Sequence, residues 1–105
     1  MIINNNDYNI PNVVVTENVS IGDNTIGTER EYEKLRAIVK NSGMFMGKMK
    51  LAGTDISGTM ICNLADSGIE MYTISNYGNQ LKIILGYLTV VSGNANLNIL
   101  VKSLV

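Results

Sequence analysis

Apolar and polar residues alternate with a period of two through residues 45–51, 56–64 and 69–75, and further apolar segments cover 80–91 and 97–104. This alternation places successive side chains on opposite faces and predicts β-strands. Short segments rich in Gly, Asn, Asp and Ser separate the strands, as is typical of tight turns. Because connections this short join antiparallel neighbours, residues 44–105 are predicted to form an antiparallel meander of about five strands.

Before the meander the apolar period changes to that of a helix. Residues 28–42 hold one apolar stripe made of Tyr32, Leu35, Ile38 and Val39. Thr28 and Glu31 have the spacing of a capping box, and Gly43 suits the left-handed conformation that ends a helix. These signals predict an amphipathic helix over 28–42, whose other charges, such as the pair Glu33 and Arg36, form a solvated face.

The N-terminal part of the chain is rich in Asn. Residues 13–16 form a β-branched run that predicts one strand, and residues 1–12 are expected to be a flexible arm that docks from about Ile10 onward. The fold class is therefore mainly β with one α-helix (α+β). We expect a single domain over 1–105, in which the meander forms a small sandwich or barrel and the helix follows the N-terminal strand.

The last part of the chain has more apolar residues than one sheet face can bury. From Met71 onward the only charged residues are Lys82 and Lys102, and 15 of the 26 residues in 80–105 are apolar. Since both strand parities are apolar, a second surface must cover this hairpin. The expected homo-oligomer interface consists of Leu81, Ile83, Ile84, Leu85, Tyr87, Leu88, Val90 and Leu100.

Charge and composition exclude several classes of protein. The formal net charge is −1, with 16% charged residues, which gives no basic patch for nucleic acid. The N-terminal residues lack a signal-peptide pattern, and no apolar run has the length of a membrane span, so we expect a cytoplasmic protein without membrane or nucleic-acid partners. A single cysteine, Cys62, rules out an internal disulfide.

Two short segments deserve comparison with known ligand loops. Residues 43–48 resemble a phosphate-binding loop, but three residues rather than four separate the glycines, and Met49 follows Lys48 where Ser or Thr is needed. Asp23 and Asn24 lack the alternating oxygen ligands of a calcium loop. We interpret the first segment as a strand and the second as a turn, and we expect no metal and no cofactor.

Catalytic groups are scarce as well. The chain has no His, so Cys62 lacks the usual base for thiol catalysis, and its parity with Met60 and Leu64 indicates a core position. Asp55 and Asp66 occupy turn sequences, where Asp is favoured for backbone hydrogen bonds, and Glu70 is the remaining candidate acid. We therefore predict a protein that is not an enzyme and has no catalytic residues.

Over its last two-thirds the chain is rich in Asn and Gly, poor in charge and β in character. This composition is similar to that of phage virion parts such as tail, fibre or baseplate proteins. We expect a structural subunit that associates with itself and with other assembly proteins, and that can be incorporated in a virion. The alternative is a small protein, of the kind that phages and mobile elements encode, that binds and inhibits or adapts another macromolecule.

Overall fold

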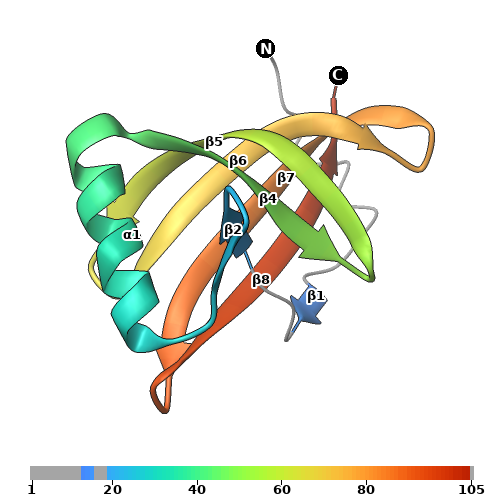
Figure 1. Cartoon of the computed structure of the whole chain (residues 1–105). Coiled ribbons are helices and arrows are strands. Elements are labelled where there is room, and N and C mark those ends of the chain that lie inside the picture. Colours follow the sequence, from blue (N-terminus) through green and yellow to red (C-terminus); the bar gives the residue numbers. More distant parts are fainter. Residues whose placement is uncertain (1–12, 16–18, 105) are drawn as a thin grey trace.

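The computed structural model describes residues 13–15 and 19–104, and it shows a mainly β fold with one helix (Figure 1). A single antiparallel sheet has the strand order β1-β8-β7-β6-β5-β4-β2-β3. It curls into a half-barrel, with the helix at one end. The elements are β1 (Val13–Val15), β2 (Val19–Ile21), β3 (Asn24–Ile26), α1 (Glu29–Ser42), β4 (Met44–Leu51), β5 (Thr54–Ala65), β6 (Gly68–Tyr77), β7 (Gln80–Val91) and β8 (Asn94–Ser103).

The five long strands β4–β8 form the predicted meander. Three of their four connections are two-residue turns in which both residues have positive φ: Ala52–Gly53, Gly78–Asn79 and Ser92–Gly93. Two positive φ angles define the type I′ turn, whose twist matches the twist of the flanking strands. These turns fix the register of each hairpin, and Ala52 and Ser92 adopt a conformation that non-glycine residues rarely take.

The strand count differs from the sequence-based expectation. The strand predicted at 13–16 is present as β1, but β2 and β3 were not expected, and every strand belongs to one sheet rather than to a sandwich. Strands of three residues are too short to show a period of two, which explains why the sequence did not reveal them. The predicted arm, residues 1–12, lies outside the described residues.

The helix α1 begins and ends as its capping sequence predicts. The Glu31 backbone N–H donates to Thr28 Oγ1 (3.3 Å), and Glu31 Oε1 accepts from the backbone N–H groups of Thr28 (3.0 Å) and Gly27 (3.1 Å). These hydrogen bonds, above all the one from Gly27, lower the pKa of the Glu31 carboxyl. At the other end Gly43 has φ 70° and donates to the Val39 carbonyl.

Side chains from both the helix and the sheet fill the interior of the half-barrel. On the helix side Tyr32, Leu35 and Val39 are buried, whereas Ile38 of the predicted stripe is 38% exposed. From the sheet, Met49 of β4 reaches across to β7, where a Cβ on Gly86 would collide with its sulfur. The curl thus brings strands that are distant in the sheet order together, and the helix covers the inner side of the sheet.

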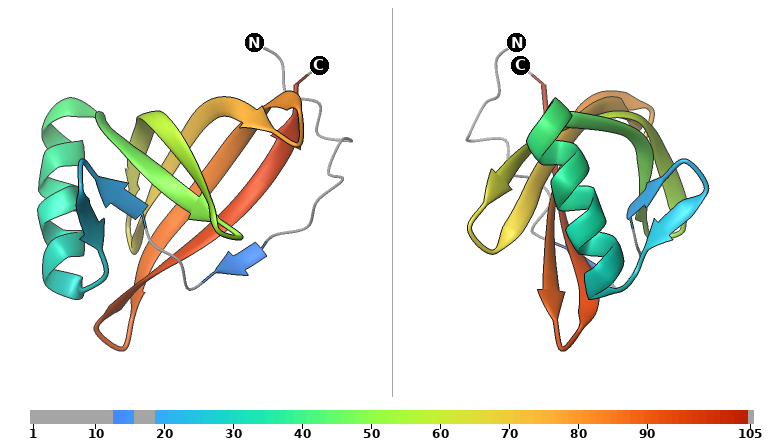
Figure 2. Two further views of the ribbon diagram at one scale, coloured as in Figure 1. Left: turned by 45° about the vertical axis from the view of Figure 1, so that its right-hand side comes forward. Right: turned by 60° about the vertical axis from the view of Figure 1, so that its left-hand side comes forward.

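The segment that follows the terminal strand β3 is joined to β8 near the start of the helix. The Ala95 backbone N–H donates to the Gly27 carbonyl (3.0 Å), and the Glu29 N–H donates to the Gly93 carbonyl (3.0 Å). Gly27 directly follows β3, while Ala95 belongs to β8. These bonds close the half-barrel at one point and anchor the first turn of α1. Figure 2 shows two further views of this arrangement.

Arg36 connects the helix to the turn between β5 and β6. Its Nη1 donates to the carbonyls of Gly68 (2.9 Å) and Ala65 (3.1 Å) and to the Tyr32 hydroxyl (3.2 Å). The guanidinium carbon also lies 5.8 Å from the centre of the Tyr32 ring. The expectation that Arg36 belongs to a solvated face is therefore wrong, because it satisfies backbone carbonyls 29 and 32 residues away.

Replacing Arg36 by Met should therefore destabilise the fold. Met keeps much of the apolar stem but removes the donors, so the substitution should lower the free energy of unfolding by about 1–3 kcal/mol. Urea denaturation measures this change, with Lys40→Met as the control because Lys40 is exposed on the same helix. Equal losses in the two variants would show that the contacts of Arg36 contribute nothing to stability.

Candidate interaction surface

The outer face of the sheet, opposite the helix, carries a continuous line of apolar side chains. Strand pairing places Met44 opposite Ile61, Ile61 opposite Tyr72, Tyr72 opposite Leu85, and Leu85 opposite Leu100. Directly opposed residues have Cβ atoms about 5 Å apart, so neighbouring side chains along this line touch. We call these five residues the apolar row; it crosses all of β4–β8.

A second line, which we call the polar row, runs beside the apolar row. It consists of Asn63, Glu70, Tyr87 and Asn98, which oppose one another in the same way. The Asn63 amide donates to Glu70 Oε1 (3.2 Å). Because outward residues repeat every two positions, the two rows lie about 6.6 Å apart along the strands. The outer face therefore has an apolar centre with a polar border on one side.

Several apolar side chains of the outer face are open to solvent. Met44 is 47% exposed, Met46 65%, Ile74 42% and Leu81 53%. On the far side of the apolar row, Ile74 opposes Ile83, and Ile83 opposes Lys102; the last two are buried. Exposed apolar residues gathered on one face, rather than scattered, are typical of interaction surfaces.

Two hollows lie side by side along the outer face. The larger, of about 500 Å³, is bordered by Leu85 and Leu100 of the apolar row and by Glu70, Tyr87 and Asn98 of the polar row. The smaller, of about 260 Å³, is bordered by Ile61, Tyr72, Asn63 and Cys62. Glu70, Met71 and Leu85 border both. Among the described residues Glu70 is the only charged side chain at either hollow, so the surface combines apolar contact with a single negative charge.

The structure divides the predicted interface between the two sides of the sheet. Leu81, Leu85, Tyr87 and Leu100 have the outward parity, and so has Ile83, which is buried but does not belong to the interior cluster. The remaining three predicted residues point inward: Ile84 and Leu88 lie in the interior cluster, and Val90 packs against it. Sequence reasoning missed Met44, Ile61, Tyr72 and Ile74, although the alternation in 44–51, 56–64 and 69–75 places them all outward.

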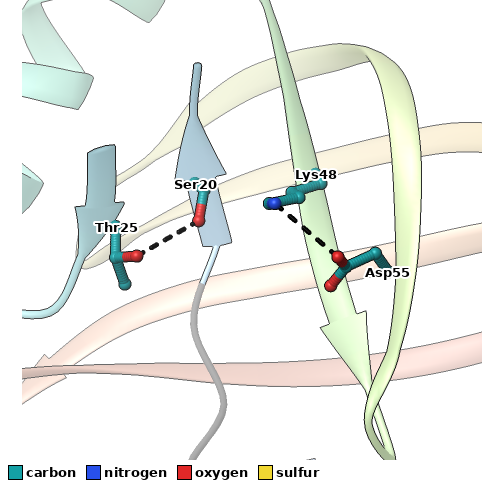
Figure 3. A network of polar contacts seen from close by, with 4 residues as sticks. All are labelled: Ser20, Thr25, Lys48 and Asp55. Carbon is teal, nitrogen blue, oxygen red and sulfur yellow. Dashed lines mark hydrogen bonds and ion pairs between the residues drawn. The ribbon is translucent and has the colours of Figure 1, made fainter. Parts of the chain in front are cut away.

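The segments compared with ligand loops have structural roles. Residues 43–48 comprise the helix C-cap Gly43 and the first half of β4. Asp23 lies in the turn between β2 and β3, and Ser20 and Thr25 of that hairpin approach each other through their hydroxyls (3.4 Å; Figure 3). Within residues 13–15 and 19–104, no three Cys, Asp or Glu side chains gather as metal ligands would.

The candidate acids do not form a catalytic pair. Asp55 lies at the start of β5 and makes an ion pair with Lys48 (3.6 Å; Figure 3), whereas Asp66 follows the end of the same twelve-residue strand. Glu70 lies on the outer face and bonds to Asn63. The carboxylates thus occupy separate places.

Cys62 is a half-buried thiol that packs against the interior cluster. Its Sγ donates to the Met60 carbonyl (3.4 Å). Burial raises the pKa of the Cys62 thiol to about 11, because the thiolate would lose hydration. Such a thiol is a weak nucleophile at neutral pH.

Comparisons of the chain with known protein families, with characterised proteins and with solved structures find no match. In the part of the chain that the structure describes, no helix has the length and apolar composition needed to cross a bilayer.

We expect Cys62→Ala to fold normally, with a free energy of unfolding lowered by about 1 kcal/mol through lost packing. Because the thiol pKa is higher in the folded protein than its ordinary 9.0, the thiol contributes stability below pH 9 that is lost as the pH rises toward 11. Wild type should therefore lose more stability than Cys62→Ala between pH 9 and 11. Parallel pH dependences in urea denaturation would contradict the burial of this thiol.

Proposed function

We propose that the protein is a non-enzymatic structural subunit that associates with copies of itself through the outer face of β4–β8. The observation that carries this proposal is the apolar row, which continues without a polar residue across five strands. A sheet with one solvated face normally carries polar residues there. Here one continuous row of the solvated face is apolar, so burying that row against another molecule lowers the free energy by about 25 cal/mol for each Å² of apolar surface removed from water.

The arrangement of this face also supports an interface. Protein interfaces commonly have an apolar, aromatic-rich centre and a polar rim, and the apolar and polar rows provide both. Tyr72 and Tyr87 lie in adjacent rows and add large rings whose hydroxyls tolerate water. We therefore narrow the proposed interface to outward residues, with Leu85 and Leu100 from the sequence-based set and Met44, Ile61 and Tyr72 added.

The assembly that best fits the composition is a virion part such as a phage tail, fibre or baseplate, with synthesis in the cytoplasm. A second candidate function is the binding of another macromolecule, which the protein would then inhibit or adapt. The two hollows favour this candidate, because they could receive side chains of a foreign partner. The oligomeric state distinguishes the two functions, since an adaptor with a free patch is a monomer by itself.

Light scattering coupled to size-exclusion chromatography should show a homo-oligomer at micromolar concentration. Leu85→Glu places a charge within the apolar row and should yield a folded protein that dissociates, with affinity for itself lowered at least about tenfold. Ser57→Glu is the matched control, since Ser57 is exposed at the outer face of β5 away from the apolar row and should tolerate the charge.

Ile84, the inward-facing neighbour of Leu85, should respond differently to the same substitution. Ile84→Glu buries a charge in the interior cluster and should unfold the chain rather than split an oligomer. A monomeric wild type at micromolar concentration would refute self-association and leave the adaptor as the better function.

A further inference from the structure

We propose that copies of this protein associate head to tail, with the exposed side of α1 of one copy lying on the outer face of the next, so that Lys34 meets Glu70 and Ile38 enters the hollow at Leu85. This inference rests on the proposed self-association and specifies which two surfaces make the contact. A second copy of the chain thus occupies the outer face, and it binds there through its helix α1.

The two surfaces are different sides of the molecule. Tyr32, Leu35 and Val39 of α1 point into the interior cluster, so the helix covers the inner side of the curled sheet. The apolar row points away from that cluster, on the outer side. Figure 2 shows α1 standing at the end of the half-barrel, beside the β2–β3 hairpin, with the side away from the sheet open. A contact between these sides can therefore repeat from copy to copy.

The free side of α1 combines positive charge with an apolar residue. Arg30, Lys34 and Ile38 follow one another at intervals of four residues and therefore share one side of the helix. All three are exposed. Lys34 and Ile38 also border a hollow of about 350 Å³ between α1 and the β2–β3 hairpin. This side of α1 therefore carries apolar and basic residues, whereas the outer face carries apolar residues and the acidic residue Glu70.

The side chains of Lys34 and Glu70 are both exposed and can meet a charge on another copy. On α1, Glu31 forms hydrogen bonds within the capping box, and Arg36 donates hydrogen bonds to the β5–β6 turn. Lys34, by contrast, is exposed. On the outer face, Glu70 is exposed and accepts from the Asn63 amide; the one ion pair among the described residues joins Lys48 and Asp55 instead. A cation brought to Glu70 would meet an unneutralised carboxylate.

The spacing of the side chains on the two surfaces agrees. The outer face is the convex side of the curled sheet, so a straight helix contacts it over only part of its length. Lys34 and Ile38 have Cβ atoms about 5–6 Å apart, whereas Glu70 and Leu85 are diagonal neighbours about 7–8 Å apart. The long lysine side chain spans this difference. The helix can therefore place Ile38 at Leu85 in the apolar row and Lys34 at Glu70 in the polar row.

A contact between different surfaces has a consequence for symmetry. Two copies joined in this way keep one unused helix side and one unused outer face between them, so association continues until a ring closes or a filament grows. An isologous dimer would stop at two copies.

Exchange of the two charges tests the pairing. In Lys34→Glu and in Glu70→Lys, like charges would meet, and self-association measured by light scattering should weaken at least about tenfold in each. An equimolar mixture of the two variants should assemble again, because each helix then finds an opposite charge on the other variant. The double variant should assemble alone. Lys40→Glu, on another side of α1, is the control and should behave as wild type.

Circular dichroism on every variant confirms that it is folded. If wild type assembles and the single variants assemble equally well, or if they weaken and the mixture does not recover, the helix-to-sheet contact is refuted while self-association stands. A wild type that stays monomeric refutes both proposals.

Discussion

The fold depends on the packing of one side of α1 into the curl of the meander. Tyr32, Leu35 and Val39 supply the second layer of the interior, and without them the inner side of β4–β8 would face water. The sheet wraps around this filling so strongly that Met49 meets β7 at a glycine. Because one helix can cover one side only, the other side of the sheet remains a single layer, and the apolar row is left uncovered by the helix.

Two charged residues of the helix, Glu31 and Arg36, stabilise this arrangement through hydrogen bonds to backbone groups. Glu31 accepts from two N–H groups at the helix start, and Arg36 donates to two carbonyls of the β5–β6 turn. Hydrogen bonds from charged groups to the backbone are stronger than neutral ones, which makes each such residue more effective than an exposed ion pair. A chain with few charges can therefore use some of them to form hydrogen bonds with backbone groups at a helix start and at a turn.

Much of the fold was predictable from local signals. The capping box and Gly43 gave the bounds of α1 within one residue, and alternation with turn residues gave the five long strands. The short strands β2 and β3 and the role of Arg36 were not predictable, because they depend on contacts between distant segments. Along β7, apolar residues on both parities could not tell which side faces the interior; only the curl of the sheet distinguishes Ile84 from Leu85.

The ends of the sheet affect how the protein avoids uncontrolled polymerisation. Exposed strand edges are templates for the addition of further strands, which is the route to amyloid-like fibres. Here both terminal strands, β1 and β3, are only three residues long, and the backbone after β3 already bonds to β8. Each terminal strand itself offers only three residues of backbone for a foreign strand to pair with. A protein of this shape can expose an apolar face while its terminal strands give edge-to-edge growth, which usually accompanies β-rich, weakly charged sequences, only a short template.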